Sequence, residues 1–359
     1  MSVGRFLQQA AAGASSGVPA DLAVLPHEDG GGGVQVLDIS DPTNMSVLGT
    51  TGSVAAMTKP FQLKLDVTNN RAFVVCEDDS VAVIDISNTS SPSVTGALAQ
   101  AHGMKYCDID PSRDLVFGSD FTNPGGIRIY DVSTPASPSL SGSSTASFYN
   151  DSHGIANHRS KNYCFVAAPS YVFSWNVSNS SSPSIGHALN DSTNFDDSYA
   201  IKLDETNNVA FVARDNGITS VNISNENSMS VMDTATDGSS NTYVRDLAID
   251  LDAGLAFVPS ADGNCLMVFD ISDASNLSHI STFGTSSTLS KPRGVMYDPV
   301  AKVAYVSCWY GTTGNKLIAL DCSNTSSLSV LGSVTTGNAP ARGALNIGPR
   351  EATNGEETG

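Results

Sequence analysis

The sequence has few charged residues and no long apolar stretch. Charged residues make up 15% of the 359 residues, and the formal net charge is −18. Because no run of about 18 consecutive apolar residues occurs, we expect no helix that spans a membrane. An acidic surface repels nucleic acids and anionic membranes, so we also expect no nucleic-acid partner.

Motifs of nucleophilic catalysis are missing as well. The sequence contains many serines but no G-x-S-x-G element, and no Cys–His signature accompanies its cysteines. The cysteines form no C-x-x-C pair, and we interpret them as buried free thiols, with a disulfide between neighbouring units as the alternative. They are Cys76, Cys107, Cys164, Cys265, Cys308 and Cys322.

Metal-binding patterns are weak. His102, His153 and His158 fall within two adjacent repeat units, but spacing alone places no carboxylate or third imidazole beside them. The acidic clusters at 77–79 and 194–197 do not match the spaced ligands of an EF-hand loop. We therefore predict no catalytic residue, no metal site and no cofactor.

What the sequence does contain is one short signature, repeated seven times. It consists of Asp or Asn, then an aliphatic residue or Cys, then Ser, and it begins at residues 38, 85, 131, 176, 222, 270 and 321. The intervals between these positions are 47, 46, 45, 46, 48 and 51 residues. A repeat of this length indicates a solenoid or a propeller.

Each unit reads as strands separated by turns. In the unit that contains Val81–Ser87, apolar and polar residues alternate over 61–66, a turn-forming segment follows at 66–70, and 72–75 is apolar. A further strand is predicted over 94–98. Four short strands per unit, at this spacing, are typical of a propeller blade.

The units resemble LVIVD-type β-propeller repeats. The resemblance rests on Ala72-Phe73-Val74-Val75 with Val83-Ile84-Asp85-Ile86-Ser87, and on Ala256-Phe257-Val258 with Val268-Phe269-Asp270-Ile271-Ser272. It covers about residues 21–347 and implies an all-β, seven-bladed propeller with four antiparallel strands in each blade. It implies little about activity, because propellers carry many unrelated functions.

The two ends of the repeat region complement each other. Residues 21–26 read as a second blade strand without a first, and residues 341–347 read as an innermost strand without a blade after it. We predict that they pair and close the ring, which hides two strand edges. The domains are then an N-terminal arm (1–20), the propeller (21–348) and a disordered acidic tail (349–359).

The arm lacks the apolar core of a secretory signal. Its sequence VGRFLQQAAAG resembles the N-terminal openings of structural proteins of marine tailed bacteriophages, particularly tail and fibre proteins. The resemblance implies a virion protein that docks onto other virion proteins through Arg5, Phe6 and Leu7. The alternative is a frayed arm that ends in a linker at 14–17.

Aligned units place one residue per blade at the start of the innermost strand, where it would surround the mouth of the central channel. These residues are Phe61, Lys105, His153, Tyr199, Arg245, Arg293 and Arg342. The convergence of cations predicts a site for an anion, a carboxylate ligand or a partner's acidic tail. The alternative is that each arginine bonds to loops of the neighbouring blade.

The loops after two of the second strands carry aromatic residues. Phe121, Trp309 and Tyr310 are expected on one face of the disc, where they would suit recognition of a host-surface protein or glycan. The alternative is that Trp309 packs between blades.

Together these features predict a non-enzymatic virion component of a tailed phage, on the tail, a fibre or the capsid surface, used for host recognition or particle packing. One alternative is a propeller at the bacterial cell surface or outside the cell that binds protein or glycan. A second alternative is a lactonase-like hydrolase, which would need metal-binding carboxylates in the channel, where the sequence places Arg and Lys instead.

Overall fold

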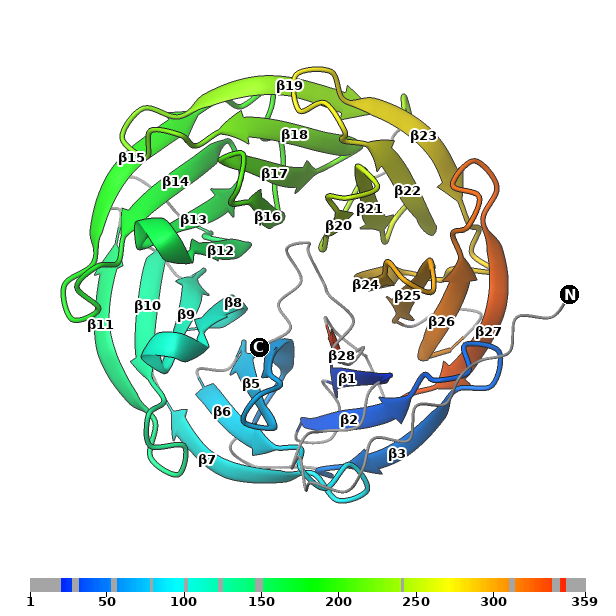
Figure 1. Cartoon of the computed structure of the whole chain (residues 1–359), viewed down its shortest axis with the longest axis horizontal. Coiled ribbons are helices and arrows are strands. Elements are labelled where there is room, and N and C mark those ends of the chain that lie inside the picture. Colours follow the sequence, from blue (N-terminus) through cyan, green and yellow to red (C-terminus); the bar gives the residue numbers. More distant parts are fainter. Residues whose placement is uncertain are drawn as a thin grey trace, which may run out of the picture.

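The computed structural model shows seven four-stranded antiparallel sheets arranged as blades around a central axis (Figure 1). It describes residues 21–27, 32–52, 57–77, 80–99, 103–121, 125–145, 151–239, 242–309, 314–337 and 343–346. Within these ranges the helical segments are two 3-10 turns, Pro111–Arg113 and Arg159–Lys161, and no helix has the length and hydrophobicity to cross a membrane. The predicted seven-bladed, all-β propeller is confirmed.

Each blade contributes one strand to each of four concentric positions. At each position the strands are named in order from blade 1 to blade 7. The innermost strands are β28 (Ala344–Asn346), β4 (Pro60–Asp66), β8 (Met104–Asp110), β12 (Ile155–His158), β16 (Ala200–Asp204), β20 (Ala248–Asp250) and β24 (Pro292–Asp298). The second strands are β1 (Leu22–His27), β5 (Arg71–Cys76), β9 (Leu115–Asp120), β13 (Tyr163–Ala168), β17 (Val209–Arg214), β21 (Leu255–Ser260) and β25 (Val303–Cys308). The third strands are β2 (Gly33–Asp38), β6 (Ser80–Asp85), β10 (Gly126–Asp131), β14 (Tyr171–Asn176), β18 (Gly217–Asn222), β22 (Cys265–Asp270) and β26 (Lys316–Asp321). The outermost strands are β3 (Ser46–Thr50), β7 (Ser93–Ala99), β11 (Ser139–Thr145), β15 (Ser184–Asn190), β19 (Ser230–Thr236), β23 (Ser278–Phe283) and β27 (Ser329–Thr335).

The ring closes as the sequence predicted. β28, from the C-terminal end of the propeller, pairs antiparallel with β1, and Val24 lies opposite Ala344. Blade 1 therefore takes its innermost strand from one end of the chain and its other three strands from the opposite end. The predicted arm (1–20) and tail (349–359) lie outside the described residues.

The hydrophobic core consists of layers between blades. Seven clusters of buried apolar side chains occur among the described residues, and each combines side chains from at least two neighbouring blades. Leu25 of blade 1, for example, packs in one cluster with Tyr305 of blade 7. A blade alone would leave both flat sides in water, so apolar burial depends on its neighbours.

The repeated signature forms the same turn in every blade. Its first residue ends the third strand, and the side-chain Oδ1 accepts a hydrogen bond of 2.8–3.0 Å from the backbone N–H two residues later. Asp and Asn are the residues whose side chains make this local bond, which competes with continuation of the strand. The signature therefore marks where each third strand stops.

A left-handed residue precedes every second strand, with φ between 51° and 65°. Its carbonyl oxygen accepts a hydrogen bond of 2.8–3.0 Å from the backbone N–H of the middle residue of the signature. These left-handed turn residues are Asp21, Asn70, Asp114, Asn162, Asn208, Gly254 and Lys302. Six of the seven are Asp, Asn or Gly, the types that tolerate left-handed backbone.

Neighbouring blades also interlock at the rim. The segment after the third strand of one blade packs against the outermost strand of the preceding blade, and an added Cβ on Gly142 or Gly332 would lie 2.4 or 2.5 Å from a carbonyl oxygen of that segment. In blades 4, 5 and 6 a serine hydroxyl donates to the corresponding carbonyl, as Ser220 does to Ala274. The contact of Gly332 with Pro42 joins blade 7 to blade 1 and completes the cycle.

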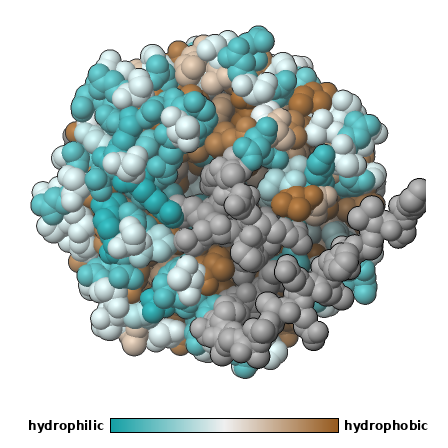
Figure 2. All heavy atoms as spheres, in the orientation of Figure 1, coloured by the Kyte–Doolittle hydropathy of each residue, from teal (hydrophilic) through white to brown (hydrophobic). Residues whose placement is uncertain are grey.

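Although the backbone repeats, the surface does not. On the face seen in Figure 2, hydrophilic residues cover most of blades 3 and 4, and hydrophobic residues are exposed in places over blade 6. Residues at which one blade differs from the repeat are therefore the candidates for a functional site.

Candidate functional site

The residues predicted to surround the channel mouth lie at one end of the disc. The first residue of each long innermost strand pairs with the last residue of the second strand, as Pro60 does with Cys76 and Met104 with Asp120. The starts of the innermost strands and the loops after the second strands therefore share one face, which we call the upper face. The turns between the first two strands lie on the opposite, lower face.

Six of the seven predicted residues are described. Phe61, Lys105 and Arg293 are the second residues of β4, β8 and β24. His153, Tyr199 and Arg245 lie within three residues before β12, β16 and β20, and Arg342 lies outside the described residues. Alignment on the repeat thus placed each described residue at the start of its innermost strand.

Three of the predicted cations on this face lie against aromatic rings. The guanidinium carbon of Arg245 is 4.2 Å from the ring centroid of Tyr199 and 3.8 Å from that of Tyr243. The guanidinium of Arg293 is 3.4 Å from the ring of Trp309. Cation–π contacts of this kind hold a charged side chain in a fixed position.

Lys105 makes the third such pair. Its Nζ lies 4.0 Å from the ring centroid of Phe121 and 3.2 Å from Oε1 of Glu77, which comes from the neighbouring blade. Trp309 and Phe121, two of the three predicted recognition residues, therefore pair with cations of their own blades. Tyr310, the third, lies outside the described residues, as do the docking residues Arg5, Phe6 and Leu7.

A series of aromatic contacts runs from Lys105 to Arg245. Tyr106 contacts Phe61 edge-on at 5.7 Å and lies 6.0 Å from His153, whose ring stacks on Tyr199 at 4.3 Å. The Tyr106 hydroxyl donates to the carbonyl oxygen of Arg245 at 3.5 Å. Because Tyr106 belongs to blade 3 and Arg245 to blade 6, this contact spans the opening between the innermost strands.

The structure thus brings His153, Tyr199 and Arg245 into one stack and places Lys105 and Arg293 in separate pairs. Sequence reasoning missed Tyr106 and Tyr243, which complete the stack. The sequence contained one signal for Tyr243, because the same position holds Lys, Gly or Asp in the other described blades. In the structure Tyr243 adopts a left-handed φ of 63°. A bulky residue in that region is an outlier that points to a specific contact.

Asp215, in the loop after β17, is a further residue that the sequence did not single out. Its Oδ1 accepts hydrogen bonds from the backbone N–H groups of Tyr243 at 2.8 Å and Val244 at 3.4 Å. Burial raises the pKa of Asp215 to about 6, with the charges of Asp197 and Asp196 adding to the increase and these hydrogen bonds opposing it. The carboxylate ties blade 5 to the segment that positions Arg245.

The histidines do not form a metal site in the described part of the chain. His153 is buried, and its Nδ1 lies 3.0 Å from the carbonyl oxygen of Ser198. His158 lies at the other end of β12, with its Nδ1 3.0 Å from Oε2 of Glu205. Over the described residues no group of three or more His, Cys, Asp or Glu side chains could hold a metal ion, and His102 lies outside them.

The prediction for the cysteines is confirmed. All six are buried free thiols, and burial raises the pKa of the Cys308 thiol to about 12. A thiol with so high a pKa is protonated at neutral pH and is a poor nucleophile.

Sequence comparison identifies the repeat. The chain matches the LVIVD repeat over residues 29–51, 64–99, 122–146, 206–237, 254–285 and 304–336. No curated protein shows significant similarity to it.

Solved structures share the fold at low sequence identity. A periplasmic gluconolactonase from Pseudomonas aeruginosa superposes with a TM-score of 0.73 at 12% identity, covering 90% of this chain and 98% of that one. A protein from Lactobacillus plantarum gives 0.73 at 15% identity, covering 90% and 99%. A candidate 6-phosphogluconolactonase from Bacteroides uniformis gives 0.73 at 10% identity, covering 89% and 98%.

We predict that Asp215→Asn changes how stability depends on pH. A carboxyl with a pKa of about 6 when folded and about 4 when unfolded binds its proton more tightly in the folded state, so stability falls as the pH rises from about 4 to about 6. The variant escapes this loss. Because the group is partly exposed to solvent, we expect its unfolding free energy relative to the parent to rise by about 1 kcal/mol between pH 4 and pH 8.

Urea unfolding of both proteins at the two pH values measures this difference. The asparagine Oδ1 retains an acceptor for the N–H groups of Tyr243 and Val244, so the local structure is preserved. A stability difference that stays constant with pH would show that Asp215 is not the titrating group.

Proposed function

The chain belongs to the LVIVD repeat family, and we propose that it is a non-enzymatic recognition propeller that contacts its partner through the upper face. The proposal rests on one observation. Three cations from three blades are each held against an aromatic ring on that face: Lys105 on Phe121, Arg245 between Tyr199 and Tyr243, and Arg293 on Trp309.

Fixed cations favour binding. A lysine or arginine that must be ordered by its partner costs about 0.5–1.5 kcal/mol in side-chain entropy, and side chains already packed on rings avoid most of this loss. A guanidinium that stacks through its plane can still donate hydrogen bonds from its edge. The upper face is therefore organised before a partner arrives.

The chemistry of the face indicates the class of partner. Carboxylates complement guanidinium groups, and aromatic rings suit flat apolar surfaces of sugars or peptides. Tyr243 is 37% exposed, so part of its surface is available for contact. A host-surface protein or glycan that carries carboxylates fits these properties.

Within this proposal the protein is a virion component of a tailed phage. The arm sequence VGRFLQQAAAG supports this location, and Arg5, Phe6 and Leu7 would dock the propeller onto other virion proteins. A bacterial cell-surface or extracellular location is the alternative.

Lactone hydrolysis is a second candidate function. The gluconolactonases share the fold, but their sequence identity to this chain is too low to infer the same activity. Asp215 favours this candidate function independently. A carboxyl with a pKa of about 6 is suited to general acid–base work, and its hydrogen bonds hold it beside the segment that carries Arg245.

Replacing two arginines tests recognition. We expect Arg245→Met with Arg293→Met to weaken binding to immobilised polygalacturonate or poly-L-glutamate about tenfold or more for each lost charge–carboxylate contact. Methionine keeps much of the side-chain length, so packing on the rings is retained. Arg71→Met, at the start of β5 on the lower face, serves as the matched control and should keep the parent's affinity.

Biolayer interferometry, with dextran as a neutral reference, measures the affinities. Equal binding by parent and double variant would overturn the role of the upper face. Opening of glucono-δ-lactone above the spontaneous rate in a pH-stat, abolished by Asp215→Asn, would instead establish the hydrolase.

Deleting residues 2–13 tests the docking arm. The deletion lies outside the propeller strands, so we expect a folded protein that no longer joins the particle. Quantitative mass spectrometry of purified particles measures its copy number relative to the major capsid protein. Particles that carry normal amounts of the shortened protein would refute docking through the arm.

A further inference from the structure

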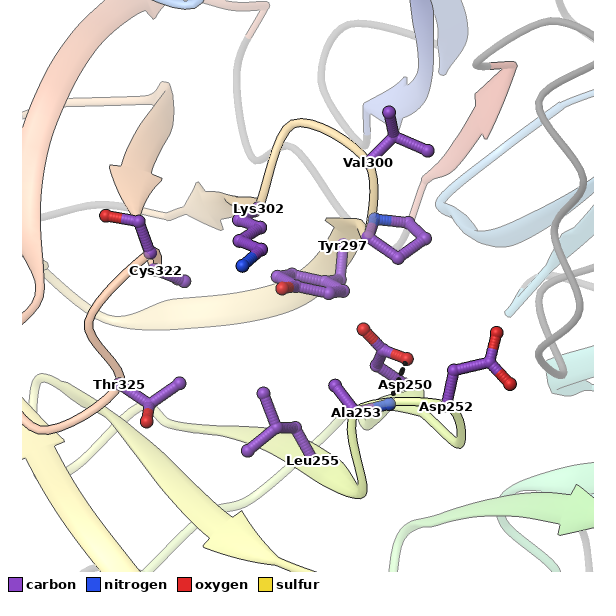
Figure 3. A pocket seen from close by; sticks show the side chains of 11 residues that line it. Asp250, Asp252, Ala253, Leu255, Tyr297, Val300, Lys302, Cys322 and Thr325 are labelled. Carbon is purple, nitrogen blue, oxygen red and sulfur yellow. Dashed lines mark hydrogen bonds between the residues drawn. The ribbon is translucent and has the colours of Figure 1, made fainter.

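A pocket of about 420 Å³ lies between blades 6 and 7 on the lower face (Figure 3). Its walls come from the turn between β20 and β21, the turn between β24 and β25, and the segment after β26. Pockets of this size hold small organic molecules. The pocket lies at the opposite end of the blades from the upper face, so a ligand bound there would be independent of the proposed function.

Lys302 departs from the repeat at this pocket. It occupies the left-handed turn position, with a φ of 56°, where every other blade has Asp, Asn or Gly. Lysine has neither the short polar side chain nor the missing Cβ that makes this backbone region accessible. A residue type that is unfavourable for left-handed backbone occurs at this position in one blade of seven, which indicates a functional role for the Lys302 side chain.

A second departure lies directly beside it. Cys322 holds the middle position of the signature, where the other six blades have Ile or Val, and its backbone N–H donates to the carbonyl oxygen of Lys302 at 2.9 Å. A thiol is smaller than these branched side chains. The exchange therefore leaves room where the other blades are filled.

Tyr297 is the third departure. The aligned positions of blades 2 to 6 hold Leu65, Ile109, Asn157, Leu203 and Ile249. The Tyr297 ring stacks on Phe257 at 4.3 Å, which fixes its orientation. Burial raises the pKa of Tyr297, so its hydroxyl remains a hydrogen-bond donor at neutral pH.

The two ends of the pocket differ in charge. The side chains of Lys302 and Tyr297 lie next to each other on one side, and Asp250 and Asp252 lie on the other (Figure 3). Neither the Lys302 ammonium nor the Tyr297 hydroxyl makes a hydrogen bond or ion pair with any residue of the described ranges. Leu255 contributes an apolar wall between these ends.

We propose that this pocket binds a small zwitterion of the amino-acid or dipeptide class. The ligand's carboxylate would contact the Lys302 ammonium and the Tyr297 hydroxyl. Its ammonium would be a further partner of the Asp250 and Asp252 carboxylates, and Oδ1 of Asp250 already accepts from the Ala253 N–H at 3.0 Å. A dianion would meet two carboxylates, and a dication would meet Lys302, so a ligand with one charge of each sign fits best.

Isothermal titration calorimetry with glycylglycine tests the proposal, with succinate as the dianion and putrescine as the dication. We expect glycylglycine to bind the parent more tightly than either reference compound. Lys302→Asn should weaken its binding at least tenfold while the melting temperature stays the same or rises, because asparagine suits left-handed backbone.

Two further variants separate binding from folding. Cys322→Ile restores the residue type of the other blades and should also weaken glycylglycine binding by filling the pocket. Asn208→Lys places a lysine at the same turn position of blade 5 and should leave binding unchanged. No heat of binding for glycylglycine with the parent, undiminished binding to Lys302→Asn, or tighter binding of succinate or putrescine would each overturn the proposal.

Discussion

Burial of apolar side chains between neighbouring blades is the interaction on which the rest of the structure depends. Each of the seven hydrophobic clusters among the described residues takes side chains from at least two blades, and none lies within a single sheet. Such a sheet is stable only if it is flanked on both sides, so the array must close. Pairing of β28 with β1, and the contact of Gly332 with the segment at Pro42, satisfy this requirement with both ends of the chain.

Closure also fixes where chemistry can occur. The innermost strands start on the upper face, so the six described residues at their starts share that face. The turns on the lower face repeat with the same hydrogen bonds. Repeated residues such as the signature aspartates maintain the blades. Individual sites arise at residues that differ from the repeat in a single blade. Tyr243 on the upper face and Lys302 on the lower face are two such residues.

The sequence predicted the scaffold more fully than the sites. Signature spacing indicated the number of blades, the closure and the placement of Lys105, His153 and Arg293, because these follow from a one-dimensional period. It did not predict that Arg245 lies between Tyr199 and Tyr243, or that Asp215 reaches Tyr243 from another blade. Those contacts depend on side-chain rotamers and distances between blades, which a period does not contain. The signature contains Cys322 as one exceptional residue, but it predicted neither the pocket beside it nor the volume of that pocket.

Equilibrium unfolding of two shortened chains tests the requirement for closure most directly. A chain that stops after Ile347 keeps β28, and a chain that stops after Gly337 lacks it. We expect the first to unfold in urea at the same midpoint as the full chain. The second should lose most of its stability or fail to show a cooperative transition, because blade 1 would lack its innermost strand. Indistinguishable unfolding of the two shortened chains would show that the propeller does not depend on closure through β28.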